Sequence, residues 1–443
     1  MTENTKSTAT GSSSLENILS FMNCLFPEPR NFAIRLWDGT YFGATQPQAF
    51  MLAINNAGAL RRMFQIPLEL SIAEAYIRKD FDIEGDLIVA FQTFETLAKT
   101  ITAQPLQLLR LRFALPKGEE LTQNIERGPA QLAGSQHSRK RDREAIQYHY
   151  DVGNDFYALW LDQRMIYSCA YFSTETEDLD TAQEKKLDII CRKLDLKPGE
   201  TLLDIGCGWG GLIIYAAQKY GVRATGITLS KEQHQLANIR IAAAGLQGTI
   251  VKPLDYRDIR GTTFDKIVSI GMFEHVGRQN LPDYFGYAYN LLKPGGLFLN
   301  HGISLAANSL QKSSFLATLF DRTIVGSGSF TQRYIFPDGE LIPVSEVNII
   351  AEQTGFDIHH VENWRKHYAR TLRHWLKRLE NHQSEAIQLS SESVYRIWKL
   401  YMSMAAYSFD IGNLAVNQTL LSKPDNSARK VAVADAKRCC VAT

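Results

Sequence analysis

The sequence predicts an α/β fold in which a Rossmann-like sheet with flanking helices forms the larger part. A smaller, mainly helical N-terminal domain precedes it. Short apolar runs rich in β-branched residues alternate with amphipathic stretches in the second half of the chain, a pattern typical of helices packed on both faces of a parallel sheet. A glycine-rich turn follows the first of these runs. The length of 443 residues exceeds that of most single domains.

Five short runs are predicted to be the strands of this sheet. They are residues 201–205, 223–228, 249–252, 264–270 and 297–301. Apolar residues recur at helical spacing between them, which predicts helices over residues 212–220, 231–244 and 280–292. The same spacing predicts helices around residues 48–64 and 71–98 of the N-terminal domain. No internal repeat is evident.

Composition divides the chain into five segments, because Ser/Thr-rich, Gly/Pro-rich and basic stretches interrupt the patterned regions. In order, these are a disordered segment (1–14), an N-terminal domain (15–115), a linker (116–143), the larger domain (144–423) and a flexible tail (424–443).

Bulk properties exclude several classes of protein. A net charge of +1 gives no global field that would favour nucleic acid. The six cysteines form no CxxC pair, so the sequence predicts no metal site or disulfide framework and favours a reducing compartment. The polar N-terminus does not resemble a signal peptide, and no apolar run of about 18–20 residues predicts a membrane span.

The sharpest local motif is LLDIGCGWGG, residues 202–211. An apolar strand ends at Asp204, where a carboxylate could bind a cationic amino group, and glycines then let the backbone approach a ligand. The pattern is GxGxG rather than GxGxxG, and the next strand is followed by Thr228 instead of the acidic residue usual in dinucleotide sites. A turn without a ligand, a nicotinamide or flavin site, and an S-adenosylmethionine site remain open on this motif alone.

Five further segments accompany this turn. They are YHYDVGNDFYALWLD (148–162), YSCAYF (167–172), GMFEHVG (271–277), YIFPDG (334–339) and HYARTLRHW (367–375). In this order the six motifs resemble the cyclopropane-fatty-acyl-phospholipid synthases and the related mycolic acid cyclopropane synthases, over about residues 148–423. The N-terminal region more loosely resembles the small helical domain of the phospholipid enzymes.

The resemblance implies a class I methyltransferase fold for residues 144–423 and S-adenosylmethionine as cofactor. Gln233 would bind the ribose, and Tyr256 and Arg257 would flank the adenine. The full set of implied cofactor contacts is Tyr167, Ser168, Asp204, Gly206, Cys207, Gly208, Trp209, Gly210, Thr228, Leu229, Ser230, Gln233, Tyr256 and Arg257.

Family members also hold bicarbonate beside the transferable methyl group. The resemblance assigns it to Cys169 and Ile303 through backbone groups, and to Glu274, His301 and Tyr368. Ile303 stands in NHGIS, which departs from the family's usual His-Thr-Ile. Taken singly, Glu274 could start a helix, and the other side chains could be ordinary core residues.

The implied reaction transfers the methyl carbon of S-adenosylmethionine to the cis double bond of an unsaturated fatty acyl chain of a phospholipid. A carbocation results, which aromatic side chains can stabilise. Its deprotonation by bicarbonate closes a cyclopropane ring. Candidates for the aromatic role are Tyr167, Tyr171, Phe172, Phe273 and Tyr368. A methyl- or methylene-branching enzyme, a methyltransferase for an unrelated small molecule and a non-catalytic lipid-binding protein stay open as alternatives.

Two basic segments could meet anionic lipid, residues 138–143 and 364–378, although each could equally be a solvated face or linker. The stretch between Ile303 and Tyr334 could form a lid over the acyl chain. We therefore expect a cytoplasmic enzyme, peripherally associated with the inner face of the membrane, with no nucleic acid or metal as ligand. The family resemblance is compatible with a homodimer. The acyl carrier, phospholipid or carrier-protein thioester, is left open.

Overall fold

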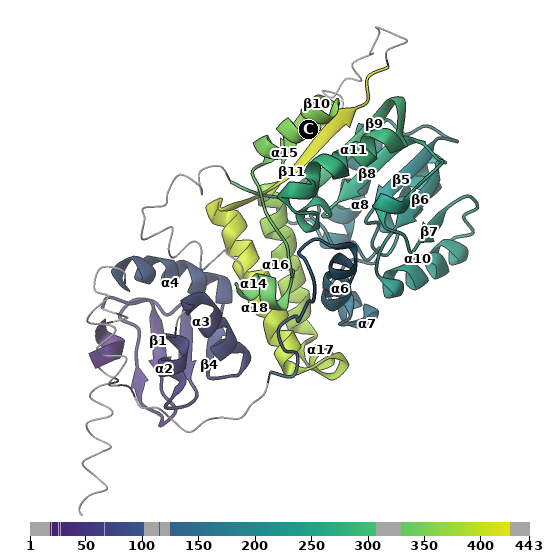
Figure 1. Cartoon of the computed structure of the whole chain (residues 1–443). Coiled ribbons are helices and arrows are strands. Elements are labelled where there is room, and N and C mark those ends of the chain that lie inside the picture. Colours follow the sequence, from purple (N-terminus) through teal and green to yellow (C-terminus); the bar gives the residue numbers. More distant parts are fainter. Residues whose placement is uncertain are drawn as a thin grey trace, which may run out of the picture. The chain divides into compact units, whose positions relative to one another are not determined.

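The computed structural model describes residues 18–101, 115, 125–306 and 329–425, except residues 19, 25, 27 and 66. Figure 1 shows the chain. It divides into two compact units. The first comprises Met1–Pro129, Phe315–Tyr334 and Ser391–Tyr407, and the second comprises Ala130–Ser314, Ile335–Ser390 and Ser408–Thr443. Neither unit is a single continuous stretch of sequence.

The first unit contains a four-stranded sheet in the order β2-β1-β3-β4. The strands are β1 (Phe32–Arg35), β2 (Tyr41–Phe42), β3 (Phe50–Ile54) and β4 (Phe81–Gly85). The helices are α2 (Ala59–Met63), α3 (Leu68–Ile77), α4 (Leu87–Ile101) and α14 (Phe330–Tyr334), with most of α18 (Glu392–Ile411). Stacked rings of Phe32 and Phe50, with centroids 5.0 Å apart, lie in its core.

The predicted helices of this unit are partly wrong. Residues 48–64 contain strand β3, and β4 interrupts residues 71–98. The mainly helical description therefore omitted a sheet. The reason is that FMLAI and FDIEG are short apolar runs, whose period cannot distinguish a buried strand from part of a helix.

The second unit is built on a seven-stranded sheet in the order β10-β11-β9-β8-β5-β6-β7. Its strands are β5 (Thr201–Ile205), β6 (Arg223–Ile227), β7 (Ile250–Lys252), β8 (Phe264–Ile270), β9 (Leu292–Leu305), β10 (Asp357–Asn363) and β11 (Leu414–Ser422). The five predicted strands are confirmed and pair in parallel. The sheet as a whole is mixed, because β11 runs antiparallel to both its neighbours.

Helices cover both faces of this sheet, as predicted. One buried cluster joins the sheet to α8 (Leu179–Lys193), α9 (Gly211–Tyr220) and α10 (Lys231–Ala243). The other joins it to α11 (Leu281–Leu291) and α15 (Val344–Thr354). Leu202 belongs to the first cluster and Leu203 to the second, because successive residues of a strand face opposite sides.

The remaining helices of this unit are α6 (Arg139–Tyr150), α7 (Asn154–Ala158), α16 (Arg365–Asn381) and α17 (Gln383–Leu389), with short 3₁₀ turns at Tyr256–Asp258, Phe273–His275 and Arg278–Asn280. Residues 139–143, predicted to end the linker, form the first turns of α6. In the part of the chain that the structure describes, no helix is both long and apolar enough to cross a bilayer. The segments expected to be a disordered N-terminus, most of the lid and most of the tail lie outside the described residues.

Candidate active site

A cavity lies at the carboxyl ends of β5, β6 and β8, where open α/β sheets bind ligands. Of the fourteen residues predicted to contact the cofactor, Gly210 and Ser230 do not line it and the other twelve do. These twelve are Tyr167, Ser168, Asp204, Gly206, Cys207, Gly208, Trp209, Thr228, Leu229, Gln233, Tyr256 and Arg257. The turns after three different strands thus meet around one space.

Gly210 and Ser230 shape the site by capping helices. Gly210 precedes α9 with φ 78°, a conformation that glycine adopts without strain, and its N–H donates to the Cys207 carbonyl at 3.0 Å. The hydroxyl of Ser230 precedes α10 and accepts from the Gln233 N–H at 3.3 Å. The two residues therefore fix the N-termini of the helices that border the cavity.

Beyond β6, the Thr228 hydroxyl donates to Gln233 Oε1 at 2.7 Å, which orients the Gln233 amide. The amide nitrogen Nε2 is buried and has no hydrogen-bond partner in the described part of the chain. A buried donor without a partner is costly, and ribose hydroxyls could accept from it. The ribose position implied by the family resemblance thus fits this geometry.

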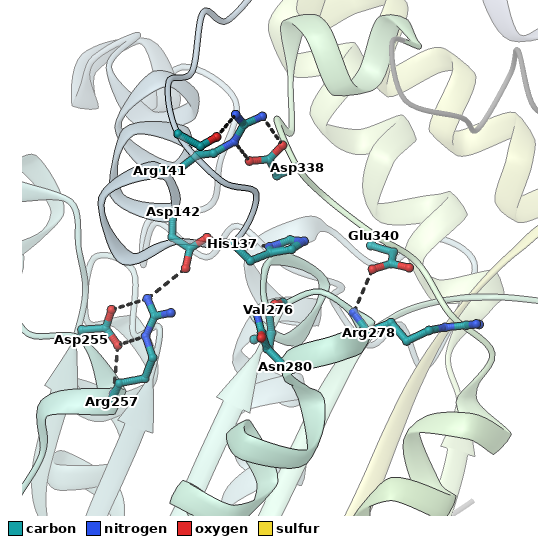
Figure 2. Close-up of polar contacts among 11 residues, drawn as sticks. His137, Arg141, Asp142, Asp255, Arg257, Val276, Arg278, Asn280, Asp338 and Glu340 are labelled. Carbon is teal, nitrogen blue, oxygen red and sulfur yellow. Dashed lines mark hydrogen bonds and ion pairs between the residues drawn. The ribbon is translucent and has the colours of Figure 1, made fainter.

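Helix α6 lines the same cavity as Tyr256 and Arg257. Figure 2 shows that Asp142 of this helix contacts Arg257. Arg257 Nη2 donates to Asp142 Oδ2 at 2.9 Å and to Asp255 Oδ2 at 2.7 Å, while Arg257 Nε donates to Asp255 Oδ1 at 2.9 Å. Burial opposes ionisation of Asp255, but the hydrogen bonds and charge of Arg257 outweigh it, and the pKa of Asp255 lies below its ordinary value. The guanidinium therefore ties α6 to the loop after β7.

Sequence reasoning missed several residues that line this cavity. Three of them come from α6, one from α8 and two from loops. They are Asp142, Ile146, Tyr150, Lys186, Asp255 and His275. Tyr150 and His275 stood in quoted motifs but were given no role. Asp142, Ile146 and Lys186 reach the cavity only because α6 and α8 pack beside the sheet, which local pattern does not reveal.

Asp204 and Lys186 provide opposite charges at the β5 end of the cavity. Asp204 is 3% exposed, and burial raises the pKa of its carboxyl to about 7 despite the opposing charge of Lys186. Burial likewise lowers the pKa of Lys186 to about 8. The two groups can stay ionised together because each offsets the other's loss of hydration.

The five residues predicted to hold bicarbonate are not among those that line the cavity. Two of them are in direct contact, because the Ile303 N–H donates to Glu274 Oε1 at 2.6 Å. Burial raises the pKa of Glu274 to about 7. The second oxygen, Glu274 Oε2, is buried and has no hydrogen-bond partner among the described residues.

His301 and Cys169 approach a common neighbour, Trp364. The His301 ring lies 5.6 Å from the Trp364 ring between centroids, and Cys169 Sγ lies 3.8 Å from the Trp364 carbonyl oxygen. His301 Nδ1 is 3.0 Å from the amide nitrogen of Gln418, whereas His301 Nε2 is buried without a partner in the described chain. Burial and nearby lysines hold the pKa of His301 well below its ordinary value, so the ring is neutral.

Tyr368 is connected to the cofactor cavity through aromatic packing. Its ring packs against Phe409 and Trp375 at centroid distances of 4.8 Å and 6.0 Å. Trp375 in turn packs against Tyr167, which lines the cavity, at 5.3 Å. In the structure, Glu274 thus contacts Ile303, and Cys169 and His301 both lie beside Trp364. Tyr368 is linked to Tyr167 of the cofactor cavity through Trp375.

Comparison with known proteins identifies the family. The profile described as "Mycolic acid cyclopropane synthetase" matches residues 137–419, which is more than half of the chain. The chain belongs to this family. A "Probable fatty acid methyltransferase" of Pseudomonas putida is 38% identical over 88% of this chain and 91% of that protein. The "Cyclopropane-fatty-acyl-phospholipid synthase" of Escherichia coli is 37% identical over 67% of this chain and 72% of that protein.

A solved structure of this family agrees with the fold. The mycolic acid cyclopropane synthase CmaA1, complexed with SAH and CTAB, has a TM-score of 0.60 and 35% identity over 63% of this chain and 98% of that chain. The second unit of the present protein therefore has the class I methyltransferase fold. Its cofactor, as a member of this family, is S-adenosylmethionine. Of the three interpretations of the glycine turn, S-adenosylmethionine binding is the one that agrees with this cofactor.

Proposed function

We propose that this methyltransferase adds the methyl carbon of S-adenosylmethionine to the cis double bond of an unsaturated fatty acyl chain of a phospholipid and closes a cyclopropane ring. The observation that carries the proposal is a pair of buried polar atoms without partners in the described chain, Glu274 Oε2 and His301 Nε2. Both belong to residues that the family resemblance assigns to the reacting centre.

Bicarbonate fits these two atoms. It has one O–H group, which could donate to the Glu274 carboxylate, and oxygens that could accept from the neutral His301 ring. Tyr368 would add a side-chain contact, and Cys169 would contribute a backbone group. The Ile303 N–H, which the family resemblance also assigns to bicarbonate, donates to Glu274 Oε1 and would act by orienting that carboxylate. Bound there, bicarbonate would supply a base for the proton that the acyl carbocation must lose. Glu274 and His301 would hold and orient that base.

The chain itself must stabilise positive charge and exclude water, because an alkene is a weak nucleophile. Tyr167 and Trp209 line the cofactor cavity and are largely enclosed by other aromatic rings. Their faces favour a cation through the ring quadrupole. Tyr171 and Phe172 instead stack on His367 and His374, with centroids 4.4 Å and 5.1 Å apart. Of the five aromatic candidates named from the sequence, Tyr167 alone lines this cavity, and we therefore assign it the role of stabilising the cation.

We also propose that the protein is cytoplasmic and binds peripherally to the inner face of the membrane. Most arginines of the two basic segments, residues 138–143 and 364–378, already have partners within the protein. Arg141 pairs with Asp338, Arg373 with Asp410, and Arg378 donates to Asp180 at 2.5 Å. Within these two segments, the exposed cations that have no ion-pair partner among the described residues are Arg143, Lys366 and Lys377. These three are the groups we expect to meet anionic headgroups.

The test is product analysis by mass spectrometry. Purified protein is incubated with S-adenosylmethionine, bicarbonate and vesicles of a monounsaturated phospholipid. Gain of one CH₂ with loss of the ozone-cleavable double bond would support ring closure on a phospholipid. The same gain with a retained alkene would assign the enzyme to methylene branching. No gain, with cofactor binding intact, would exclude phospholipid and direct the assay to carrier-protein thioesters.

A further inference from the structure

A lysine that the reaction above does not use is buried beside the cofactor cavity. Lys186 lies on α8, is 1% exposed, and lines the cavity together with Ser168 and Asp204. Its ammonium donates to the Ser168 hydroxyl at 2.9 Å, the one hydrogen bond it makes within the described ranges. An ammonium has three N–H groups, so two donors stay available for a ligand.

The acidic neighbours of Lys186 do not use these donors. Asp162 accepts instead from the N–H groups of Arg164 and Ile166, at 2.9 Å and 2.8 Å. The Asp204 side chain accepts no hydrogen bond from any residue that the structure describes, and it lines the same cavity. At one end of the cavity, the Lys186 ammonium and the Asp204 carboxylate are thus shielded from bulk solvent, and both can bind a ligand in the cavity.

This combination matches a zwitterion. The methionine moiety of S-adenosylmethionine carries an α-ammonium and an α-carboxylate on one carbon. Asp204 complements the ammonium, and Lys186 complements the carboxylate through charge-assisted hydrogen bonds. The position also fits. The family resemblance assigns the ribose to Gln233, after β6, and the adenine to Tyr256, after β7, which leaves the β5 end of the cavity for the methionine moiety.

We propose that Lys186 binds the α-carboxylate of S-adenosylmethionine and is a specificity-determining residue for the intact cofactor. The inference rests on cofactor use by the family and not on ring closure or on the lipid substrate. It predicts that the protein discriminates between S-adenosylmethionine and its decarboxylated form, which lacks this carboxylate but keeps the sulfonium, amine and adenosine.

Isothermal titration calorimetry tests it, with both cofactors titrated into the full-length protein in CO₂-free buffer. Lys186→Met retains the length and packing of the side chain but removes the charge. It is expected to weaken S-adenosylmethionine binding by about tenfold or more, as for a lost charge-assisted hydrogen bond. Binding of the decarboxylated cofactor should change by less than about twofold. Lys186→Gln is a second variant should the first not fold.

Lys193→Met is the matched control. Lys193 lies on the same helix and is 7% exposed. It donates to Gln418 at 2.8 Å and pairs with Glu362, and it does not line the cavity. Its loss should leave the affinities for both cofactors unchanged.

Equal losses for both cofactors in the Lys186 variants would overturn the proposal, as would unchanged S-adenosylmethionine affinity. A loss that appears only after bicarbonate is added would also overturn it, because the bound anion would then be bicarbonate. A wild-type protein that binds S-adenosylmethionine but does not prefer it to the decarboxylated form contradicts the proposal without any variant. Binding of neither cofactor by the wild type would instead refute the cofactor assignment itself.

Discussion

At the scale of single residues, the hydroxyl of Tyr368 offers a clean test of the reacting centre. The ring is held by Phe409 and Trp375, so Tyr368→Phe should preserve packing and remove the hydroxyl alone. We expect turnover to fall by about tenfold or more, as for a lost hydrogen bond to a charged group, while the Kd of S-adenosylmethionine changes little. Steady-state kinetics and calorimetry measure the two quantities.

The control is Tyr407→Phe, another buried tyrosine, which belongs to the first unit. It should leave turnover unchanged. If Tyr368→Phe instead weakens cofactor binding and the bound fraction turns over normally, Tyr368 acts on the cofactor and not on the reacting centre.

Glu274 is the second residue with a measurable signature, because burial raises the pKa of its carboxyl to about 7. The ordinary value is 4.5, so the folded state holds the proton more tightly than the unfolded chain. The tighter binding of this proton adds to the free energy of unfolding. This contribution is fully present below pH 4.5 and is lost as the pH rises through 7. Glu274→Gln removes this dependence. From pH 5 to pH 8 the variant should therefore gain about 2–3 kcal/mol relative to wild type.

Urea unfolding of both proteins at the two pH values measures this difference. The comparison isolates Glu274 from Asp204, which also has a raised pKa but is present in both proteins. A free-energy difference that stays constant between pH 5 and pH 8 would mean that Glu274 titrates as an ordinary exposed carboxylate. Its proposed role in holding bicarbonate would then lose its electrostatic basis.

At the scale of elements, the turn between β5 and α9 lets the cofactor approach the backbone. Gly208 lines the cavity with φ 54°, and a side chain built on it would meet no atom within 4 Å. Gly208→Val should therefore fold, at a modest cost in backbone strain, but project into the space that the cofactor occupies. We expect the Kd of S-adenosylmethionine to rise by about tenfold or more, with the melting temperature of the cofactor-free protein lowered only slightly.

Gly245→Val is a suitable comparison for this test. Gly245 also has a positive φ and open space around it, but it lies outside the cavity. Equal effects of the two substitutions on cofactor affinity would show that strain, and not occlusion, weakens binding.

The elements also explain which predictions succeeded. Strands β5 and β8 were located to the residue, because an apolar run is followed directly by a glycine, which marks its end. The start of helix α6, residues 139–143, was assigned to a linker, because RKRDR has the composition of a solvated segment. Arg141, Arg139 and Asp142 instead form ion pairs with Asp338, Asp258 and Arg257, respectively (Figure 2 shows the contacts to Asp338 and Arg257). Such pairing depends on residues more than 100 positions away, which local pattern does not reveal.

At the scale of the whole molecule, the family match and the folded units do not coincide. The match covers residues 137–419, yet Ser391–Tyr407 within it belongs to the first unit. In that unit Arg396 is buried and donates to the Tyr76 and Phe81 carbonyls at 2.7 Å and 3.0 Å. The part of the chain that resembles shorter relatives therefore contributes a helix to the N-terminal core.

A fragment that starts at Ala130 should consequently fail to behave as an independent enzyme. Removing residues 1–129 leaves the Arg396 guanidinium without Tyr76, Phe81 and the paired carboxylate of Asp82. Loss of the partners of a buried charge costs about 3–5 kcal/mol, and the apolar face of α18 is exposed as well. Size-exclusion chromatography should show aggregation of this fragment, and Arg396→Met in the same fragment should reduce it only in part, because the apolar face stays uncovered. A monodisperse fragment that binds S-adenosylmethionine like the full chain would show that α18 folds without the first unit and would contradict this division of the molecule.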